Sequence, residues 1–223
     1  MQTLQAQVGS APHALGAHAG KRIELAPGLA LPCFTMRFDR NEEIFGEEEE
    51  ADFVYKVVSG AVRDVCILSD GRRQIGAFHL PGDVFGMECA ETHSHSAEAV
   101  VDSEIALIRR STLNKAADED GGAARKLWSL TARDLQRLQD HMLLLGRKSA
   151  LERVASFLIK MSARGPAGEA IDLPMSRNDI ADYLGLTIET VSRTFTQLER
   201  DRAISMPSSR HIVLHGRLAM ADA

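Results

Sequence analysis

The sequence contains little cysteine: Cys33, Cys66 and Cys89 are its only three, and they stand far apart. An iron–sulfur cluster takes about four thiolate ligands, so the cysteine content argues against such a centre. The wide spacing also implies no disulfide framework. The three residues are interpreted as ordinary core or strand thiols, and a redox-reactive Cys89 stays open as an alternative.

Long hydrophobic runs are absent as well. No apolar stretch approaches the roughly 20 residues that cross a bilayer, and no charged start followed by an apolar segment marks a signal peptide. We therefore predict a cytoplasmic location and no membrane partner. Residues 1–22 are rich in Ala, Gly, Gln and His, and this composition predicts a disordered segment.

The chain has no overall positive charge, since its formal net charge is −5. The charge is divided unevenly, because residues 1–145 carry a net −7 and residues 146–223 a net +2. Attraction to phosphate requires a basic contacting face and not a basic chain. The C-terminal part therefore stays compatible with DNA, and a length of 223 residues allows two modest domains.

Residues 176–200 predict two short helices joined by a tight turn. Ser176 is an N-cap residue, and Asp179 three positions later completes a start similar to a capping box. Gly185 ends the first helix, because glycine accepts the left-handed backbone of a helix terminus. Thr187 then caps the second helix, so the pattern is typical of a helix-turn-helix.

The second of these helices has two different faces. Arg193 can donate two hydrogen bonds to guanine, Glu189 can accept one from cytosine, and the small Ser192 leaves room beside a base. These three share a face at the helix N-terminus, a geometry suited to a DNA major groove. The face predicted to be buried carries Ile188, Val191, Phe195 and Leu198.

Further DNA contacts are predicted around this reading face and at the tip of a hairpin, the wing, over residues 203–214. For Ile188 two interpretations stay open, an apolar contact to a thymine methyl group or packing inside the domain. His211 beside the wing tip is a further phosphate candidate. The additional or backbone contacts are assigned to Ser176, Arg177, Thr187, Ile188, Thr190, Thr196 and Arg210.

The rest of the chain divides into two parts. Short strands at regular spacing with Gly and Pro turns predict an antiparallel sandwich or jelly roll over residues 23–121. Residues 122–148 predict a long helix with a coiled-coil seam that dimerises, although the seam could also pack only on its own β-domain. A winged helix-turn-helix then fills residues 149–223. The seam consists of Trp128, Thr131, Leu135, Leu138, Met142 and Leu145.

The run Ile180–Arg193 closely resembles the helix-turn-helix of Crp–Fnr transcription regulators, and Glu189-x-x-Ser192-Arg193 matches the reading motif of the Fnr and FixK branches. The segments Val58–Gly60, Asp70–Arg72 and Leu80–Gly86 look like the β-roll of cyclic-nucleotide-binding-type domains. The resemblance implies an α+β fold with β-roll, dimerisation helix and winged helix-turn-helix. A departure from the family is Arg202, where glycine often follows the recognition helix and where the turn into the wing is therefore in question.

What the resemblance implies about function is a FixK-like transcription activator and not an enzyme. It implies a homodimer that binds a palindrome of TTGA-type half-sites and also contacts RNA polymerase. The implied targets are genes of oxygen-limited respiration, denitrification or nitrogen fixation. The oxygen-sensing Fnr proteins carry clustered N-terminal cysteines, and no cysteine precedes Cys33 here.

No cofactor is expected in the β-roll. Cyclic-nucleotide-binding relatives place a Gly-Glu pair and an arginine against the phosphate, whereas this chain has Gly86-Met87-Glu88 and, at the arginine position, Ser94-His95-Ser96. The alternative is an effector-gated regulator that binds a small ligand or haem in the β-roll.

A second alternative is a metal site. Gly86, His93, His95 and Glu98 are similar to part of the cupin metal motif, and alternate strand residues share one face. The glutamate spacing differs from that motif, and its second half is missing. The preferred interpretation is therefore no metal site, with residues 92–96 forming a solvated loop.

Overall fold

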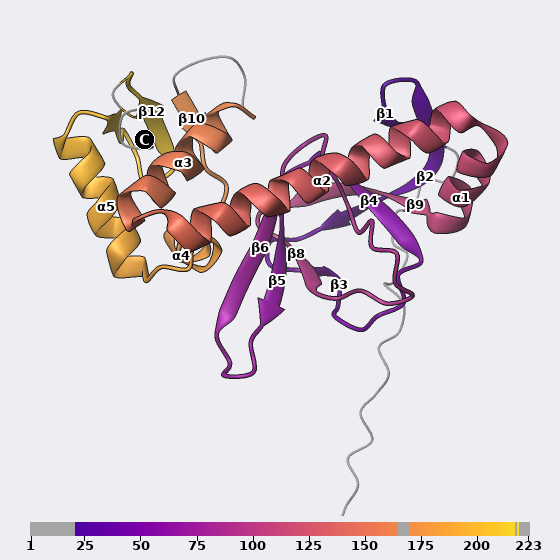
Figure 1. Cartoon of the computed structure of the whole chain (residues 1–223), viewed down its shortest axis with the longest axis horizontal. Helices are drawn as coiled ribbons and strands as arrows, with labels where there is room; N and C mark the ends of the chain where they lie inside the picture. Colours follow the sequence, from indigo (N-terminus) through magenta and orange to yellow (C-terminus); the bar gives the residue numbers. More distant parts are fainter. Residues whose placement is uncertain (1–20, 165–169, 217, 219–223) are drawn as a thin grey trace, which may run out of the picture.

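The computed structural model describes residues 21–164, 170–216 and 218. Figure 1 shows a β-roll, a long helix that crosses it, and a smaller helical domain at the far end of that helix. The predicted α+β class with these three parts is confirmed. Within the described ranges, no helix is both long and apolar enough to cross a membrane.

The β-roll is built from nine short antiparallel strands. The strands are β1 Lys21–Ala26, β2 Leu29–Phe38, β3 Glu43–Phe45, β4 Phe53–Ser59, β5 Val62–Ile67, β6 Arg73–His79, β7 Val84–Phe85, β8 Ser96–Ala99 and β9 Ser103–Arg109. They form two sheets with the orders β1-β2-β9-β4-β7 and β3-β8-β5-β6. Apolar side chains such as Val57, Val62 and Ile105 are buried between them.

The N-terminal boundary differs from the prediction. Strand β1 begins at Lys21 and pairs with β2, so residues 21 and 22 belong to the β-roll and not to a disordered segment. Residues 1–20 of the segment that was predicted to be disordered lie outside the described residues.

The turn between β4 and β5 requires glycine. Gly60 has a φ of +88°, in the left-handed region that favours glycine. A Cβ at this position would lie 2.2 Å from the hydroxyl oxygen of Ser103 and 2.6 Å from its Cα. The close approach of β9 to this turn therefore leaves no space for any side chain.

Two helices follow the β-roll, α1 (Arg110–Glu119) and α2 (Gly121–Arg147). Helix α1 falls within residues 23–121, which were assigned to the β-roll domain, and it was not predicted. Asp120 separates the two helices and caps α2 by accepting hydrogen bonds from the backbone N–H groups of Gly122 and Ala123. Helix α2 thus begins one residue before the predicted 122–148 and ends one residue earlier.

The C-terminal domain contains three helices and a small antiparallel sheet. The elements are α3 Ala150–Ser162, β10 Ala170–Asp172, α4 Arg177–Leu184, α5 Ile188–Arg200, β11 Ile204–Ser205 and β12 His211–Leu214. The strand order is β10-β12-β11, so the hairpin of β11 and β12 forms the wing. Phe157, Leu184 and Phe195 are fully buried between the helices, and α3 begins with a capping box of Ser149 and Glu152.

Candidate DNA-binding site

Local hydrogen bonds fix the helix-turn-helix. The Ser176 hydroxyl accepts a bond from the Asp179 backbone N–H, and the Asp179 carboxylate accepts one from the Ser176 backbone N–H. This capping box starts α4 where the sequence predicts it. Gly185 ends the helix with a φ of +60°, and Thr187 caps α5 by accepting a bond from the Thr190 backbone N–H.

Helix α5 lies at the outer edge of the domain, away from the β-roll (Figure 1). Val191, Phe195 and Leu198 on its inner face are buried, as the helical spacing predicts. Ile188 differs, because 41% of its surface is exposed and it does not pack inside. This exposure contradicts packing inside the domain, and contact with a thymine methyl group stays a prediction.

The three predicted base readers are all exposed on the outer face of α5: Glu189, Ser192 and Arg193. Glu189 stands in the first turn, where the helix dipole favours a negative charge. Its own backbone N–H, the Thr187 hydroxyl and the charge of Arg193 hold the pKa of Glu189 below its usual value. The face therefore presents an ionised acceptor beside a guanidinium donor.

The outer face extends beyond the predicted readers. A shallow groove follows the last turns of α5, and it is lined by Ser192, Arg193, Thr196, Gln197, Arg200 and Asp201. Gln197 and Arg200 were not among the predicted contacts. Both follow Arg193 at helical spacing on the same exposed face, and this spacing was the signal that could have identified them.

Two residues predicted to contact the DNA backbone have structural partners instead. The Arg177 guanidinium lies 3.4 Å from the centre of the Phe195 ring and donates to the Met206 sulfur. Burial lowers the pKa of Arg177 to about 10. The Ser176 hydroxyl is engaged in the helix cap. Phe195 and Met206 thus hold Arg177 against the domain, and its contact to phosphate stays a prediction.

The other predicted contacts lie at the surface. Thr196 is exposed on α5, Thr190 is half-buried beside Thr187, and Arg210 is exposed at the wing tip. His211 is paired, since its Nδ1 lies 2.8 Å from a carboxylate oxygen of Asp172 in β10. The wing therefore offers Arg210 as its outward cation.

The seam on α2 is largely uncovered in a single chain. Trp128 is 75% exposed and Met142 66%, and Leu135 and Leu138 are each more than half exposed. Thr131 is exposed as well, whereas the predicted seam residue Leu145 is half-buried against the core of the C-terminal domain. Leu143, which the prediction missed, is also exposed. A row of apolar side chains on one helix is unusual for a surface that faces only water.

The predicted solvated loop at residues 92–96 is only partly correct, because Thr92 and Ser94 are exposed but His93 is buried and Ser96 begins β8. His93 is 1% exposed, and its ring stacks on Phe45 with 3.6 Å between the ring centres. His95 lies 3.5 Å from a carboxylate oxygen of Asp64, which also pairs with His79 at 2.8 Å. Although burial acts to raise it, the pairing with His79 lowers the pKa of Asp64. His79 and His93 therefore belong to the interior of the β-roll, and His95 lies half-buried at its edge.

The residues of this cluster contact one another. Among the residues that the structure describes, no group of three or more His, Cys, Asp or Glu side chains is arranged to hold a metal ion. Glu88, the counterpart of the phosphate-pocket glutamate, is paired with His93 at 3.3 Å. Arg110 beside it is bonded to the backbone oxygens of Ala90 and Glu88. Glu88 and Arg110 at this corner thus have partners within the β-roll, and the absence of a cyclic nucleotide stays a prediction.

Comparisons with known proteins match both ends of the chain. The family model described as the cyclic nucleotide-binding domain matches residues 35–120, and that of the Crp-like helix-turn-helix domain matches residues 152–223. The nitrogen fixation regulation protein FixK of Azorhizobium caulinodans is 52% identical over 188 residues, which cover 82% of this chain and 76% of that protein. FixK of Rhizobium meliloti is 41% identical over 181 residues, which cover 81% and 82%.

A solved structure agrees with these relatives. The structure of FixK2 from Bradyrhizobium japonicum superposes with a TM-score of 0.83 at 53% identity, and the match covers 86% of this chain and 98% of that one. The likeness therefore extends from the β-roll through the long helix to the DNA-binding domain.

Proposed function

The chain belongs to the Crp–Fnr family of transcription regulators, with FixK proteins among its relatives, and on this premise we propose how it reads DNA. The proposed protein is a homodimeric activator that binds a palindrome of TTGA-type half-sites. Its proposed targets are genes of oxygen-limited respiration, denitrification or nitrogen fixation. The observation that carries the proposal is the exposed face of Glu189, Ser192 and Arg193 at the N-terminus of α5.

The proposed readers suit the single G·C pair of a TTGA half-site. Arg193 donates to guanine O6 and N7, and the ionised Glu189 accepts from the cytosine N4 amino group of the same pair. Ser192 lies between them in sequence and adds little bulk. Ile188, with its exposed side chain, is placed to contact a thymine methyl group. Thr196 and Arg210 are the proposed backbone contacts on this surface.

Dimerisation through α2 would explain why the proposed DNA site is a palindrome. A two-fold dimer presents two recognition helices about one DNA turn apart, so it requires an inverted repeat. The exposed row from Trp128 to Met142 is the proposed interface. Leu145 at its C-terminal end instead joins α2 to the DNA-binding domain.

The β-roll is proposed to act without a small-molecule effector. Its interior is filled by stacked Phe45, Tyr55, Phe85 and His93 rings, and Glu88 is engaged by histidine. Regulation would then act on the amount or the chemical state of the protein. As an activator it would also contact RNA polymerase, and the proposed location is the cytoplasm.

The proposal is tested by DNA binding of the aerobically purified chain without any added ligand. A duplex with a TTGA-type palindrome is titrated beside a scrambled duplex, with Arg193→Ala as the variant. We expect tight binding to the palindrome alone, weakened roughly 10- to 100-fold in Arg193→Ala because one bidentate base contact is lost.

A matched control is Arg72→Ala, which removes the same charge from an exposed β-roll turn. It should bind like the unaltered protein. Equal binding to both duplexes would contradict the proposed reading face. Binding that appears only after a nucleotide, haem or metal is added would contradict the effector-free β-roll.

A further inference from the structure

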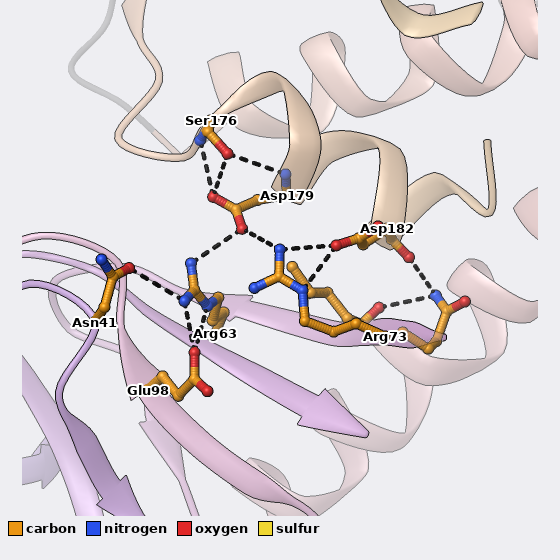
Figure 2. Close-up of polar contacts among 9 residues, drawn as sticks. Asn41, Arg63, Arg73, Glu98, Ser176, Asp179 and Asp182 are labelled. Atoms are coloured by element: carbon orange, nitrogen blue, oxygen red, sulfur yellow. Dashed lines mark hydrogen bonds and ion pairs between the residues drawn. The ribbon is translucent and has the colours of Figure 1, made fainter. Parts of the chain in front are cut away.

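A buried polar cluster joins the β-roll to the helix-turn-helix, and we name it the latch: Arg63 and Arg73 from the β-roll with Asp179 and Asp182 from α4 (Figure 2). Arg63 donates to Asp179 over 3.0 Å, and Arg73 donates to the same oxygen over 2.8 Å. Arg73 also donates to Asp182 over 2.8 Å. The latch therefore connects residues more than 100 positions apart in the sequence.

Asp179 has two roles in this arrangement. Its Oδ2 accepts bonds from the backbone N–H and the hydroxyl of Ser176 and so completes the cap of α4. Its Oδ1 accepts the two arginines. The carboxylate that starts the first helix of the helix-turn-helix is thus held directly by the β-roll. Bonds to charged groups in such a buried setting are among the stronger ones in proteins.

The β-roll arginines are themselves held in place. Arg63 donates through Nε to Glu98 over 2.9 Å and through Nη2 to Asn41 over 3.2 Å, both within the β-roll (Figure 2). Gln74, next to Arg73, donates to the backbone oxygen of Asp182 over 2.7 Å. The contact is therefore a two-sided network and not a single mobile side chain.

The latch leaves the DNA-reading surface open. It contacts α4, whereas Glu189, Ser192 and Arg193 on α5 remain exposed. Besides the covalent link at Lys148 and Ser149, Phe78 of β6 packs against Phe157 and Tyr183 of the DNA-binding domain, and apolar contact of this kind has no directional preference. A directional attachment that does not cover the readers can fix their orientation without blocking them.

We infer that the latch sets the orientation of α4 and α5 relative to the β-roll, and that Arg73 is a positioning residue for palindrome recognition. This inference rests on the proposed dimeric binding of a palindrome. The two DNA-binding domains of a dimer that reads half-sites one turn apart must keep a fixed separation. Loosening the latch therefore lowers affinity for the correctly spaced palindrome and relaxes the preference for that spacing.

The test compares Arg73→Gln with Arg72→Gln in the full chain. Both variants remove one charge from neighbouring positions of one hairpin, but Arg72 is bonded to Asp70 in that hairpin and not to α4. Affinity is measured for TTGA palindromes whose half-site spacing differs in steps of one base pair. We expect Arg73→Gln to lose roughly tenfold at the best spacing, as for one lost charge-assisted hydrogen bond, and to discriminate less between spacings.

Arg72→Gln should keep both the affinity and the sharp spacing preference, and Arg73→Lys should restore part of each because it keeps the charge. A uniform loss at every spacing would mean a merely structural role and would overturn the inference. Unchanged or tighter binding by Arg73→Gln would overturn it too, since the latch would then be idle or inhibitory.

A second readout needs no DNA. Hydrogen exchange of the α4 amides is compared between the two variants and the unaltered protein, and faster exchange in Arg73→Gln alone is expected. Unchanged exchange in Arg73→Gln would overturn the inference that the latch holds α4. Absence of palindrome binding by the unaltered protein would instead overturn the proposed function, and the exchange result would still decide the latch.

Discussion

Two arginines beside neighbouring helices of the DNA-binding domain have opposite environments, Arg63 of β5 at α4 and Arg193 on α5. At α4, Arg63 reaches in from the β-roll, and the side chains of Arg63 and Asp179 are only 7% and 6% exposed. On α5, Arg193 is exposed together with Glu189 and Ser192. A buried guanidinium must have partners within the protein, because an unpaired buried charge is costly. An exposed guanidinium can instead exchange water for a base.

One residue type thus has an architectural role where the β-roll meets α4 and a proposed recognition role on α5. Where the partners of an arginine lie inside the protein, their loss lowers the stability of the folded state. Where the partners lie on DNA, their loss lowers the affinity for DNA and leaves the stability almost unchanged. Substitutions of the buried arginine should therefore change mainly the free energy of unfolding, and substitutions of the exposed arginine mainly the affinity for DNA.

The largest effect on stability is expected from Arg63→Met. The variant leaves Glu98 and Asp179 without their shared partner, and removing one member of a buried ion pair costs about 3 kcal/mol of unfolding free energy. Arg193→Met, which makes the same substitution on the exposed surface, should change that free energy by less than about 0.5 kcal/mol. Urea unfolding of both variants measures the difference, and equal losses would contradict the comparison.

A smaller effect on stability is expected when the pH is lowered, because acid protonates the buried His141. This residue of α2 is 8% exposed, and its ring lies 4.1 Å from that of Tyr183 in α4. Burial, with the charge of Lys160, lowers the pKa of His141 from 6.5 to about 4. Between these two values the unfolded chain binds more protons than the folded one, so stability is complete above pH 6.5 and falls as the pH drops towards 4.

His141 can lower the free energy of unfolding by at most about 1.4 kcal/mol per pH unit, because it binds at most one additional proton on unfolding. His141→Gln removes this group, so its unfolding free energy should fall less steeply between pH 6.5 and 4.5 than that of the unaltered protein. The measurement is urea unfolding at several pH values. Parallel pH profiles for the two proteins would show that His141 is not the group responsible.

The smallest effect is expected at the turn between α5 and β11, where the wing begins. Arg202 in this turn has a φ of +56°, a left-handed backbone conformation that favours glycine. Arg202→Gly should raise the unfolding free energy by about 1 kcal/mol, since only glycine adopts this backbone without strain. Arg202→Ala removes the same charge but keeps a Cβ. Equal stability of the two variants would show that the backbone is not strained.

The helix-turn-helix was predictable from the sequence because its signals are local. The capping box of Ser176 and Asp179, the left-handed Gly185 and the apolar spacing on α5 all act within four residues. Helix α1 was missed because only Leu113 of its ten residues is buried, so it carries no apolar stripe. Which seam residues meet a second chain stays a prediction, although most of them are exposed.

Other parts of the site followed from packing that no local pattern carries. The sequence predicted that Arg177 contacts the DNA backbone and that His93 lies in a solvated loop, whereas Arg177 lies on the Phe195 ring and His93 stacks on Phe45. Both side chains are polar at one end and flat at the other, so their exposure depends on whether an aromatic partner is brought near them. That partner comes from a different element in each case.

The sequence by itself determined the periodic and capped elements, and with them the DNA-reading face, because hydrogen bonds and side-chain spacing within a helix depend on near neighbours. Only the tertiary structure decided which charges are buried. Asp179 reads in the sequence as a helix cap alone, and its second pair of bonds comes from Arg63 and Arg73, 116 and 106 residues away. Contacts over such separations exist only after the β-roll and the helices have packed together.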